Sequence, residues 1–269
     1  VMCEVLELSE RTYYAAKNRP ASKRQLSDEA AKVEIRRVWE ANYRAYGAKR
    51  IWLTLRREGH EIARCTIERL MADMGLAGVQ RGRRPRTTVP DTAAPRSPDL
   101  VDRQFTATRP DELWVTDITY VSTWEGWLYV AAVVDLFSRR VVGWSMSAGM
   151  TAQLVTDALV MAIWRRGKPD ALLHHSDRGS QYSSEQFQRL MTDHGVVCSM
   201  SRSGNVWDNA AMESFFSSLK TERTARKMYR TRDEARADVF DYIERFYNPK
   251  RRHSTIGYMS PMEFERQAG

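Results

Sequence analysis

Three acidic residues, Asp117, Asp177 and Glu213, occupy positions at which a purely structural role does not readily explain a carboxylate. Asp117 interrupts an apolar and aromatic run that is typical of a strand, and burying a lone carboxylate there costs free energy unless a partner compensates it. A hard divalent cation such as Mg²⁺ is such a partner, because it prefers oxygen ligands and accepts substrate phosphates beside a few carboxylates. Two such ions stabilise the attacking and leaving oxygens of an in-line displacement. The three residues therefore indicate metal-dependent phosphoryl transfer.

Other residue types that bind metals give weaker signals. His174 and His175 are neighbours on a predicted strand, so their side chains point to opposite faces and make a poor chelating pair. We expect a structural role for both. Cys3, Cys65 and Cys198 are widely spaced and form no CxxC pair, so neither a disulfide framework nor a zinc site is indicated, and a reducing compartment fits.

The elements that must position the three carboxylates follow one another beyond residue 108. Three segments rich in β-branched and aromatic residues predict an antiparallel meander, followed by helix, strand, helix, strand and helix. This is the order of a ribonuclease-H-like α/β fold with a mixed five-stranded sheet and flanking helices. The predicted strands are residues 113–121, 127–135, 140–146, 171–175 and 196–200. The predicted helices run from the N-cap Thr151 to Gly167, from the capping pair Ser183 and Gln186, from about Ala210, and from a last capping pair, Thr231 and Glu234.

The first 80 residues predict a small all-α module. Residues 28–40 are typical of a helix with Ser27 as N-cap, and apolar residues recur at helical spacing from Ile51 to Met74 around a break at Gly59. Short helices with interspersed cations suit a helix-turn-helix that lies against DNA, although a solvated helical bundle explains the pattern nearly as well. The cations are Lys49, Arg50, Arg56, Arg57 and Arg64.

Positive charge is concentrated in the first third of this chain. Residues 1–100 hold 20 Lys and Arg against 13 Asp and Glu, and residues 101–269 hold 22 against 21. A basic arm on a nearly neutral body indicates a polyanionic partner, although many solvated helix faces are also basic. Residues 81–99 contain four prolines, which predicts an extended linker. Its clustered arginines, either phosphate contacts or solvated side chains, are Arg81, Arg83, Arg84 and Arg86.

Neither a long apolar run nor an N-terminal secretory signal is evident in the sequence. We therefore expect a protein without membrane attachment that is soluble and cytoplasmic. This expectation excludes a secreted, disulfide-stabilised domain and an integral membrane protein.

The carboxylates lie in motifs that resemble the transposases of the insertion-sequence-three family, in particular their catalytic reading frame, OrfB, and more broadly the Asp-Asp-Glu integrases. The resemblance covers nearly the whole chain, and the 35 residues between Asp177 and Glu213 are a specific spacing. The matching stretches are WVTDITY at 114–120, DLFSRRVVGW at 135–144, HSDRGSQY at 175–182, SGNVWDNAAMESFF at 203–216, YGAKRI at 46–51, and the segment from YNP at 247–249 to Pro261.

This resemblance implies that Asp117, Asp177 and Glu213 hold two Mg²⁺ ions, which Mn²⁺ can replace, in an integrase catalytic core. It implies a DNA-phosphate contact for Lys220, which follows Glu213 by seven residues and so projects from nearly the same helix face. It leaves Asp135 outside the ligand set, with a structural or supporting role.

Two further residues are weaker candidates for DNA contact. Trp207 is more often a packed aromatic than a base-stacking one, although its loop would approach the catalytic pocket. Arg252 belongs to a basic tail, Arg251 to His253, that either touches DNA or is a solvated helix end.

The implied activity is DNA transposition. Water cuts a phosphodiester at the transposon end, and the freed 3′-hydroxyl then attacks another phosphodiester, by way of a circular intermediate in this family. The implied partners are double-stranded DNA (terminal inverted repeats and target DNA), further copies of the chain in a dimer or larger assembly, and an OrfA-type partner or fusion, in the nucleoid of a bacterium. The expected regions are a helix-turn-helix-like domain at 1–80, a basic linker at 81–107, the catalytic core at 108–225, and a C-terminal helix and basic tail at 226–269.

Two other functions remain open from the sequence. A simple ribonuclease-H-like nuclease shares the fold and the metal chemistry, but it has no need of a basic helical arm. A catalytically inactive DNA-binding regulator has no need of three carboxylates at this spacing. A metal-dependent cleavage assay separates the regulator from the enzyme.

Overall fold

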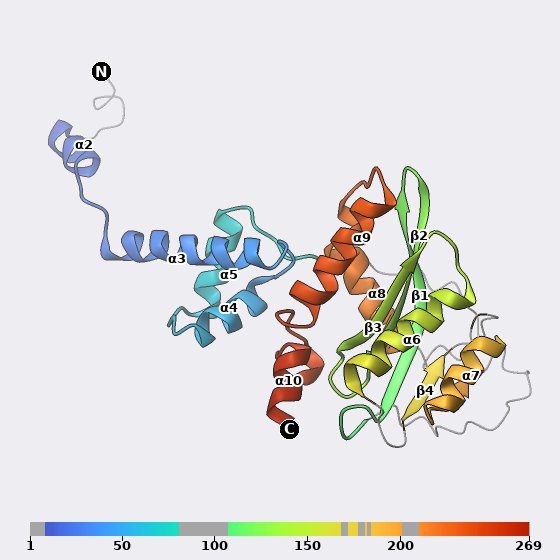
Figure 1. Cartoon of the computed structure of the whole chain (residues 1–269). Helices are drawn as coiled ribbons and strands as arrows, with labels where there is room; N and C mark the ends of the chain where they lie inside the picture. The colour runs from blue at the N-terminus through green and yellow to red at the C-terminus, as the bar shows by residue number, and fades with distance from the viewer. Residues whose placement is uncertain are drawn as a thin grey trace, which may run out of the picture. The chain divides into compact units, whose positions relative to one another are not determined.

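The computed structural model describes residues 9–80, 107–167, 172–176, 181, 184–200 and 210–268. Contacts divide the chain into two compact units, Val1–Gly78 and Val79–Gly269, each with its own buried core. In Figure 1 the first unit is blue to cyan, and the sheet of the second is green to yellow. Within the described residues, every helix is too short or too polar to cross a membrane.

The first unit consists of helices around a small apolar core, as predicted. Its longest helix starts earlier than predicted: the Ser22 hydroxyl accepts the Gln25 N–H at 3.2 Å, and the Gln25 side chain accepts the Ser22 N–H at 2.7 Å. The predicted N-cap Ser27 is therefore wrong, because the helix gains a capping box one turn before its apolar stripe begins. The helices are α2 (Glu10–Lys17), α3 (Lys23–Ala41), α4 (Ala48–Arg57) and α5 (Arg64–Asp73). Their buried residues include Ala31, Ile35, Val38, Ile51, Leu55, Ile67 and Leu70.

The second unit contains a mixed sheet of five strands in the order β3-β2-β1-β4-β5. β1 pairs antiparallel with β2 and β2 with β3, which confirms the predicted meander. β4 pairs in parallel with β1 and with β5. The architecture is the ribonuclease-H-like α/β fold expected from the order of elements. The strands are β1 (Leu113–Thr123), β2 (Gly126–Asp135), β3 (Val141–Ser147), β4 (Leu173–Ser176) and β5 (Val197–Met200).

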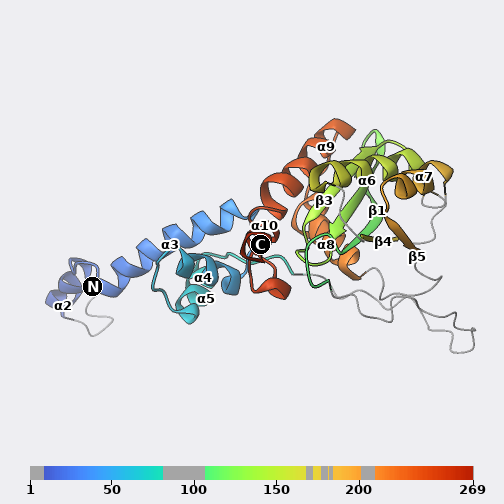
Figure 2. The same ribbon diagram turned by 60° about the horizontal axis from the view of Figure 1, so that its bottom comes forward.

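Helices cover both faces of this sheet. α6 (Ala152–Arg166) and α7 (Glu185–Asp193) share one apolar core with inward-facing residues of β1, β2 and β3. α8 (Ala210–Glu222) contacts β1 on the opposite face (Figure 2). A Cβ added to Gly143 would lie 2.1 Å from the Ala158 carbonyl oxygen, so only glycine lets α6 approach β3 this closely.

The boundaries of α6 and α7 test two of the predicted caps. α6 lies between Thr151 and Gly167, as predicted. α7 begins after Ser184, whose hydroxyl accepts the Phe187 N–H at 3.4 Å. The predicted capping pair at Ser183 is therefore wrong by one residue, and Ser183 itself lies outside the described residues.

The chain after α8 wraps the sheet rather than ending in one helix. α9 (Arg232–Asp241) begins at the predicted N-cap Thr231, but a π-helical segment (Tyr242–Tyr247) extends it and α10 (Pro261–Ala268) follows. The expectation that α9 is the last helix was therefore wrong. The buried Asn248 side chain fastens this segment to β3, since it accepts the Val141 N–H and donates to the Val141 carbonyl, both at 2.9 Å.

Arg166, at the end of α6, joins three carboxylates from separate parts of the chain. It donates to Asp111 at 2.8 Å, to Asp135 at 3.3 Å and to Glu265 of α10 at 3.0 Å. Asp135 is fully buried and also accepts the N–H groups of Asp111 and Phe137. Burial raises the pKa of Asp135 to about 6, although the Asp111 N–H, Arg166 and the Ser138 N–H oppose the change. Asp135 thus has the structural surroundings that the sequence analysis expected.

His174 on β4 is a fully buried imidazole, and we predict that it makes folding depend on pH. Its Nε2 lies 2.7 Å from the Thr116 hydroxyl, and burial, with a smaller effect of His175, lowers its pKa from 6.5 to about 3. Below pH 6.5 the His174 imidazole therefore binds a proton in the unfolded chain, whereas in the folded chain it binds one only near pH 3. The free energy of unfolding should fall through this window as pH falls, by up to about 1.4 kcal/mol per pH unit from this residue.

The measurement is urea unfolding at several pH values, compared with His174→Gln. The glutamine can still hydrogen-bond to Thr116 but cannot titrate. A shallower dependence in the variant is expected, whereas equal slopes would show that His174 does not carry the effect.

Candidate active site

Asp117 lies on β1 where the pairing with β4 ends. The parallel register runs from Leu113↔Leu173 to Thr116↔Ser176, so Asp117 is the next residue along β1. Ile118 packs against the core under α6, and strand alternation therefore places Asp117 on the face of α8. Its side chain is half-buried, and Oδ1 accepts the Ile118 N–H at 2.7 Å.

Asp177 lies outside the described residues, as do Trp207 and the four linker arginines 81, 83, 84 and 86. Its place in the chain is still informative. Asp177 follows Ser176 directly, as Asp117 follows Thr116, and Thr116 and Ser176 are register partners on parallel strands. Asp117 is thus the first β1 residue beyond the stretch paired with β4, and Asp177 is the next residue of the chain after β4.

The other two candidate residues lie on α8, which contacts β1. Glu213 is in its first turn and exposed, and Lys220 is in its last turn. The Lys220 ammonium lies 4.8 Å from the ring centre of Tyr120, three residues after Asp117. The structure therefore brings the helix that carries Glu213 and Lys220 against the strand that carries Asp117.

A buried ion pair between Glu222 of α8 and Arg251 fixes the position of α8. Arg251 donates to both oxygens of Glu222, at 2.7 and 2.6 Å, and to the Ser218 hydroxyl at 3.0 Å. Tyr242 donates to Glu222 at 2.8 Å. Arg251 is only 4% exposed, so interpreting residues 251–253 as a solvated tail was wrong for Arg251. The physical reason is that this guanidinium neutralises a carboxylate that faces inward from α8.

Arg252, which follows the buried Arg251, contacts a different part of the chain. Its guanidinium donates to the Tyr258 carbonyl at 3.2 Å and lies 3.6 Å from the Glu263 carboxylate. Its side chain is 16% exposed, so little of it is available to DNA in this conformation.

In the first unit, two of the predicted cations, Lys49 and Arg50, lie at the start of α4. Lys49 is exposed, and the Arg50 guanidinium lies 5.3 Å from the Tyr46 ring centre. Gly47 is the N-cap of α4 and makes no side-chain hydrogen bond there. Both cations therefore flank a helix N-terminus, whose partial positive charge also attracts phosphate.

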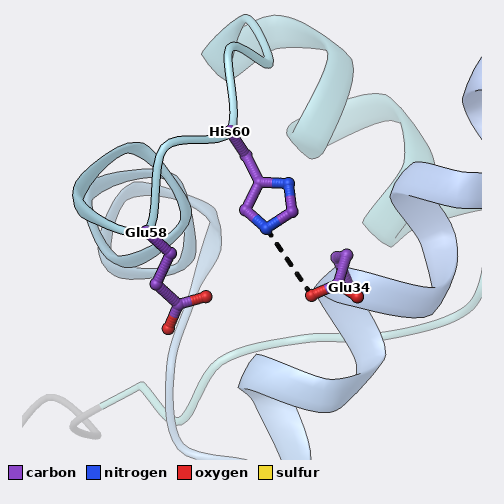
Figure 3. A group of neighbouring side chains, drawn as sticks. All are labelled: Glu34, Glu58 and His60. Atoms are coloured by element: carbon purple, nitrogen blue, oxygen red, sulfur yellow. Dashed lines mark ion pairs between the residues drawn. The ribbon is translucent and has the colours of Figure 1, made fainter.

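One group in the first unit has the residue types of a metal site. Ligand atoms of Glu34, Glu58 and His60 lie within 4.8 Å of one another (Figure 3). However, Arg37 donates to Glu34 at 2.7 Å and also to Glu58, and His60 lies 3.8 Å from Glu34. Arg37 therefore already pairs with both carboxylates, and we interpret the group as an ion-pair cluster linking α3 to the end of α4.

A basic segment beside the candidate active site was not among the residues predicted from the sequence. Residues 223–232, RTARKMYRTR, contain five cations and no acidic residue. The segment lies against the β1–β2 hairpin, since Thr123 forms a bridge with Tyr229, and the Trp124 N–H donates to the Tyr229 carbonyl at 3.0 Å. The run of charge was visible in the sequence, but its position beside β1 was not.

Comparisons with known proteins fall on the same regions. Residues 107–206 and 213–268 match two integrase core domain families, and residues 25–84 match an HTH-like domain family. The transposase for insertion sequence element IS629 of Shigella sonnei is 40% identical over 98% of this chain and 90% of its own length. Transposase InsF for insertion sequence IS3A of Escherichia coli K12 is 39% identical over 99% of this chain and 93% of its own. Among solved structures, the HTLV-2 integrase catalytic core domain in complex with magnesium is 18% identical over 59% of this chain and 98% of its own, with a TM-score of 0.44.

Proposed function

The chain belongs to the insertion-sequence transposases of the IS3 type, and on this basis we propose that Asp117, Asp177 and Glu213 hold two Mg²⁺ ions for cleavage and joining of transposon ends. The chain is a DNA transposase with an integrase core, and the proposal concerns which residues do the chemistry. The observation that carries it is the register of β1 and β4, because Thr116, the residue before Asp117, pairs with Ser176, the residue before Asp177.

The donor set suits a hard divalent cation. All three side chains offer carboxylate oxygens, which Mg²⁺ prefers over nitrogen or sulfur. Asp117 is at a strand position where pairing with β4 has stopped, and Glu213 is exposed on a helix that contacts this strand. When bound, the ions supply charge stabilisation to the attacking and leaving oxygens of an in-line displacement.

The side chains of the chain itself orient the DNA. Lys220, two helical turns beyond Glu213, holds a phosphate beside the scissile bond. Water is the nucleophile that cuts the strand, and the 3′-hydroxyl so released then attacks a second phosphodiester, whose own 3′-oxygen leaves as the new P–O bond forms. One set of carboxylates serves both steps, because each is an attack by an oxygen on phosphorus.

The remaining DNA contacts are distributed over the chain. In the HTH-like unit, Lys49 and Arg50 at the N-terminus of α4 bind backbone phosphates of the terminal inverted repeat, and the linker arginines follow the same strand. Trp207 contacts DNA nearer the catalytic core, whereas Arg252, whose side chain is 16% exposed, does not in this conformation. Pairing of two transposon ends requires at least a dimer, and an OrfA-type partner completes end recognition.

The proposal is tested by following labelled duplexes that end in the terminal repeats of the element. Cleavage and joining are expected with Mg²⁺ and with Mn²⁺, and neither is expected with EDTA. Ca²⁺ should support binding of the ends without chemistry. Joining that proceeds in EDTA would exclude the metal-ligand assignment, and binding without any joining in Mg²⁺ would point to a missing partner for end pairing.

A further inference from the structure

Three aromatic side chains on the β1–β2 hairpin are exposed, although aromatic residues on sheets usually pack against a neighbour. Tyr120 on β1 is 52% exposed, Trp127 on β2 is 48% exposed, and Trp124 in the turn between the strands is 70% exposed. Tyr120 and Trp127 meet edge to face, with ring centres 4.7 Å apart. We call these three residues the hairpin aromatic strip. Grouped exposed aromatics mark a binding surface more often than scattered ones do.

Cations lie beside the rings of Tyr120 and Trp124 and beside the backbone of Trp127. The Lys220 ammonium lies 4.8 Å from the ring centre of Tyr120, and the Arg230 guanidinium lies 5.6 Å from that of Trp124. Arg232 donates from Nε to the Trp127 carbonyl at 3.1 Å. Two of these cations, Arg230 and Arg232, belong to the basic segment 223–232. The strip is therefore apolar surface in positive surroundings, with Glu125 as the acidic residue of the turn.

Alternation of aromatic rings with cations suits single-stranded nucleic acid, because bases stack on the rings while the cations hold the phosphates. A second copy of this chain is a poorer occupant, since it also carries a net charge of +8. A fully paired duplex is also poorer, because its base faces are hidden in the stack. The charge and the rings together favour DNA with unpaired bases.

The strip lies close to the proposed active site, although on the other face of β1. Tyr120 follows Asp117 by three residues, which is about 10 Å along a strand, and strand alternation places its ring on the face opposite Asp117. Lys220 contacts Tyr120 and shares α8 with Glu213. A strand whose phosphate lies at the carboxylates therefore reaches the strip within a few nucleotides by passing the edge of β1 beyond Thr116, where pairing with β4 has ended and Lys220 contacts Tyr120.

We propose that the hairpin aromatic strip stacks unpaired bases of the strand that flanks the cleaved phosphodiester. The strip then keeps the transposon end open, so that the 3′-hydroxyl and its phosphate stay accessible. This inference rests on the proposed function, in which Asp117 and Glu213 mark the position of that phosphate.

The test compares two duplexes of the same sequence, one fully paired and one with three unpaired nucleotides at its end, bound by the full chain in EDTA. Tyr120→Ala and Trp127→Ala should each weaken binding of the unpaired end about tenfold and change binding of the paired duplex by less than about twofold. With 2-aminopurine among the unpaired nucleotides, the parent protein should quench its fluorescence, and each variant should restore it. Because these measurements need no metal, they remain informative even if the ligand assignment fails.

Two controls separate stacking from general effects. Trp127→Phe keeps an aromatic ring and should retain most of the binding and the quenching. Trp164→Ala removes another exposed tryptophan, 82% exposed on α6, and should change neither. Equal losses on both duplexes in Trp127→Ala, with unchanged thermal unfolding, would overturn the proposal. So would a change of the oligomeric state in sedimentation, since the strip would then be a contact between copies.

Discussion

Asp117→Asn and Glu213→Gln are each expected to abolish cleavage and joining of transposon ends while leaving end binding nearly unchanged. Each replacement keeps the size of the side chain and removes the negative charge that a divalent cation requires. Loss of a group that merely orients a metal ligand lowers activity or metal affinity about 10–100-fold. Loss of a ligand itself should therefore lower activity by more than about a hundredfold. The measurement is the rate of cleavage and of joining in Mg²⁺, with binding measured separately by gel shift in Ca²⁺.

The matched control is Asp135→Asn, a nearby aspartate that contacts Arg166 and backbone N–H groups. It should lower stability and leave the activity of the folded fraction within about tenfold. Strand transfer that survives in Asp117→Asn would exclude Asp117 as a ligand. Equal defects in Asp117→Asn and Asp135→Asn would mean that the assay reports folding.

Arg251→Met is expected to destabilise the second unit by about 3–5 kcal/mol, because it leaves the Glu222 carboxylate buried without its cation. Arg251 and Glu222 are 4% and 7% exposed, so water cannot replace the lost partner. The displaced α8 should also lower transposition, since this helix carries Glu213 and Lys220. Chemical unfolding measured by circular dichroism checks the first effect, and the joining assay checks the second.

The double variant Arg251→Met with Glu222→Met provides the control. A hydrophobic pair of similar volume often matches or exceeds the stability of a buried ion pair, so the double variant should recover most of the loss. A single variant within about 1 kcal/mol of the parent would show that Glu222 stays solvated or takes up a proton, and that the pair does not hold α8.

The order of elements was predictable because each has a strong local pattern. The meander shows β-branched runs separated by short turns, and α6 shows an N-cap and a C-terminal glycine, both of which the structure confirms. The candidate carboxylates stood out in the sequence for the opposite reason, since Asp117 contradicts its strand surroundings. A residue that conflicts with its predicted local structure is the clearest indication of a functional site in a sequence.

Some misses came from signals that the sequence did contain. The reciprocal capping box of Ser260 and Glu263, at 3.2 Å in each direction, begins α10 with Pro261 in the first helical position. Likewise, Ser22 and Gln25 cap α3 ahead of its apolar stripe. In both cases the cap lies outside the apolar periodicity on which the prediction depended.

Other features could not be predicted because their partners are distant in sequence. Arg251 looks like part of an exposed basic run, and only the fold shows that it faces Glu222, 29 residues earlier. The exposure of Tyr120 and Trp127 is equally invisible, because an aromatic residue on a strand normally indicates packing. Contacts between residues that are distant in sequence decide these cases, and a single sequence does not show those contacts.

The wrapping of the sheet by its last segment also affects when the enzyme becomes competent during translation. A ribosome that has translated Glu213 has supplied all three proposed ligands, yet Arg251 and Glu265 are still to come, and Glu265 follows its partner Arg166 by 99 residues. Until both residues have been translated, the Glu222 carboxylate has no cationic partner, and α8 lacks the buried ion pair that fixes its position. Prematurely terminated chains that end between Glu213 and Arg251 should therefore carry every proposed ligand and still be unable to cut DNA.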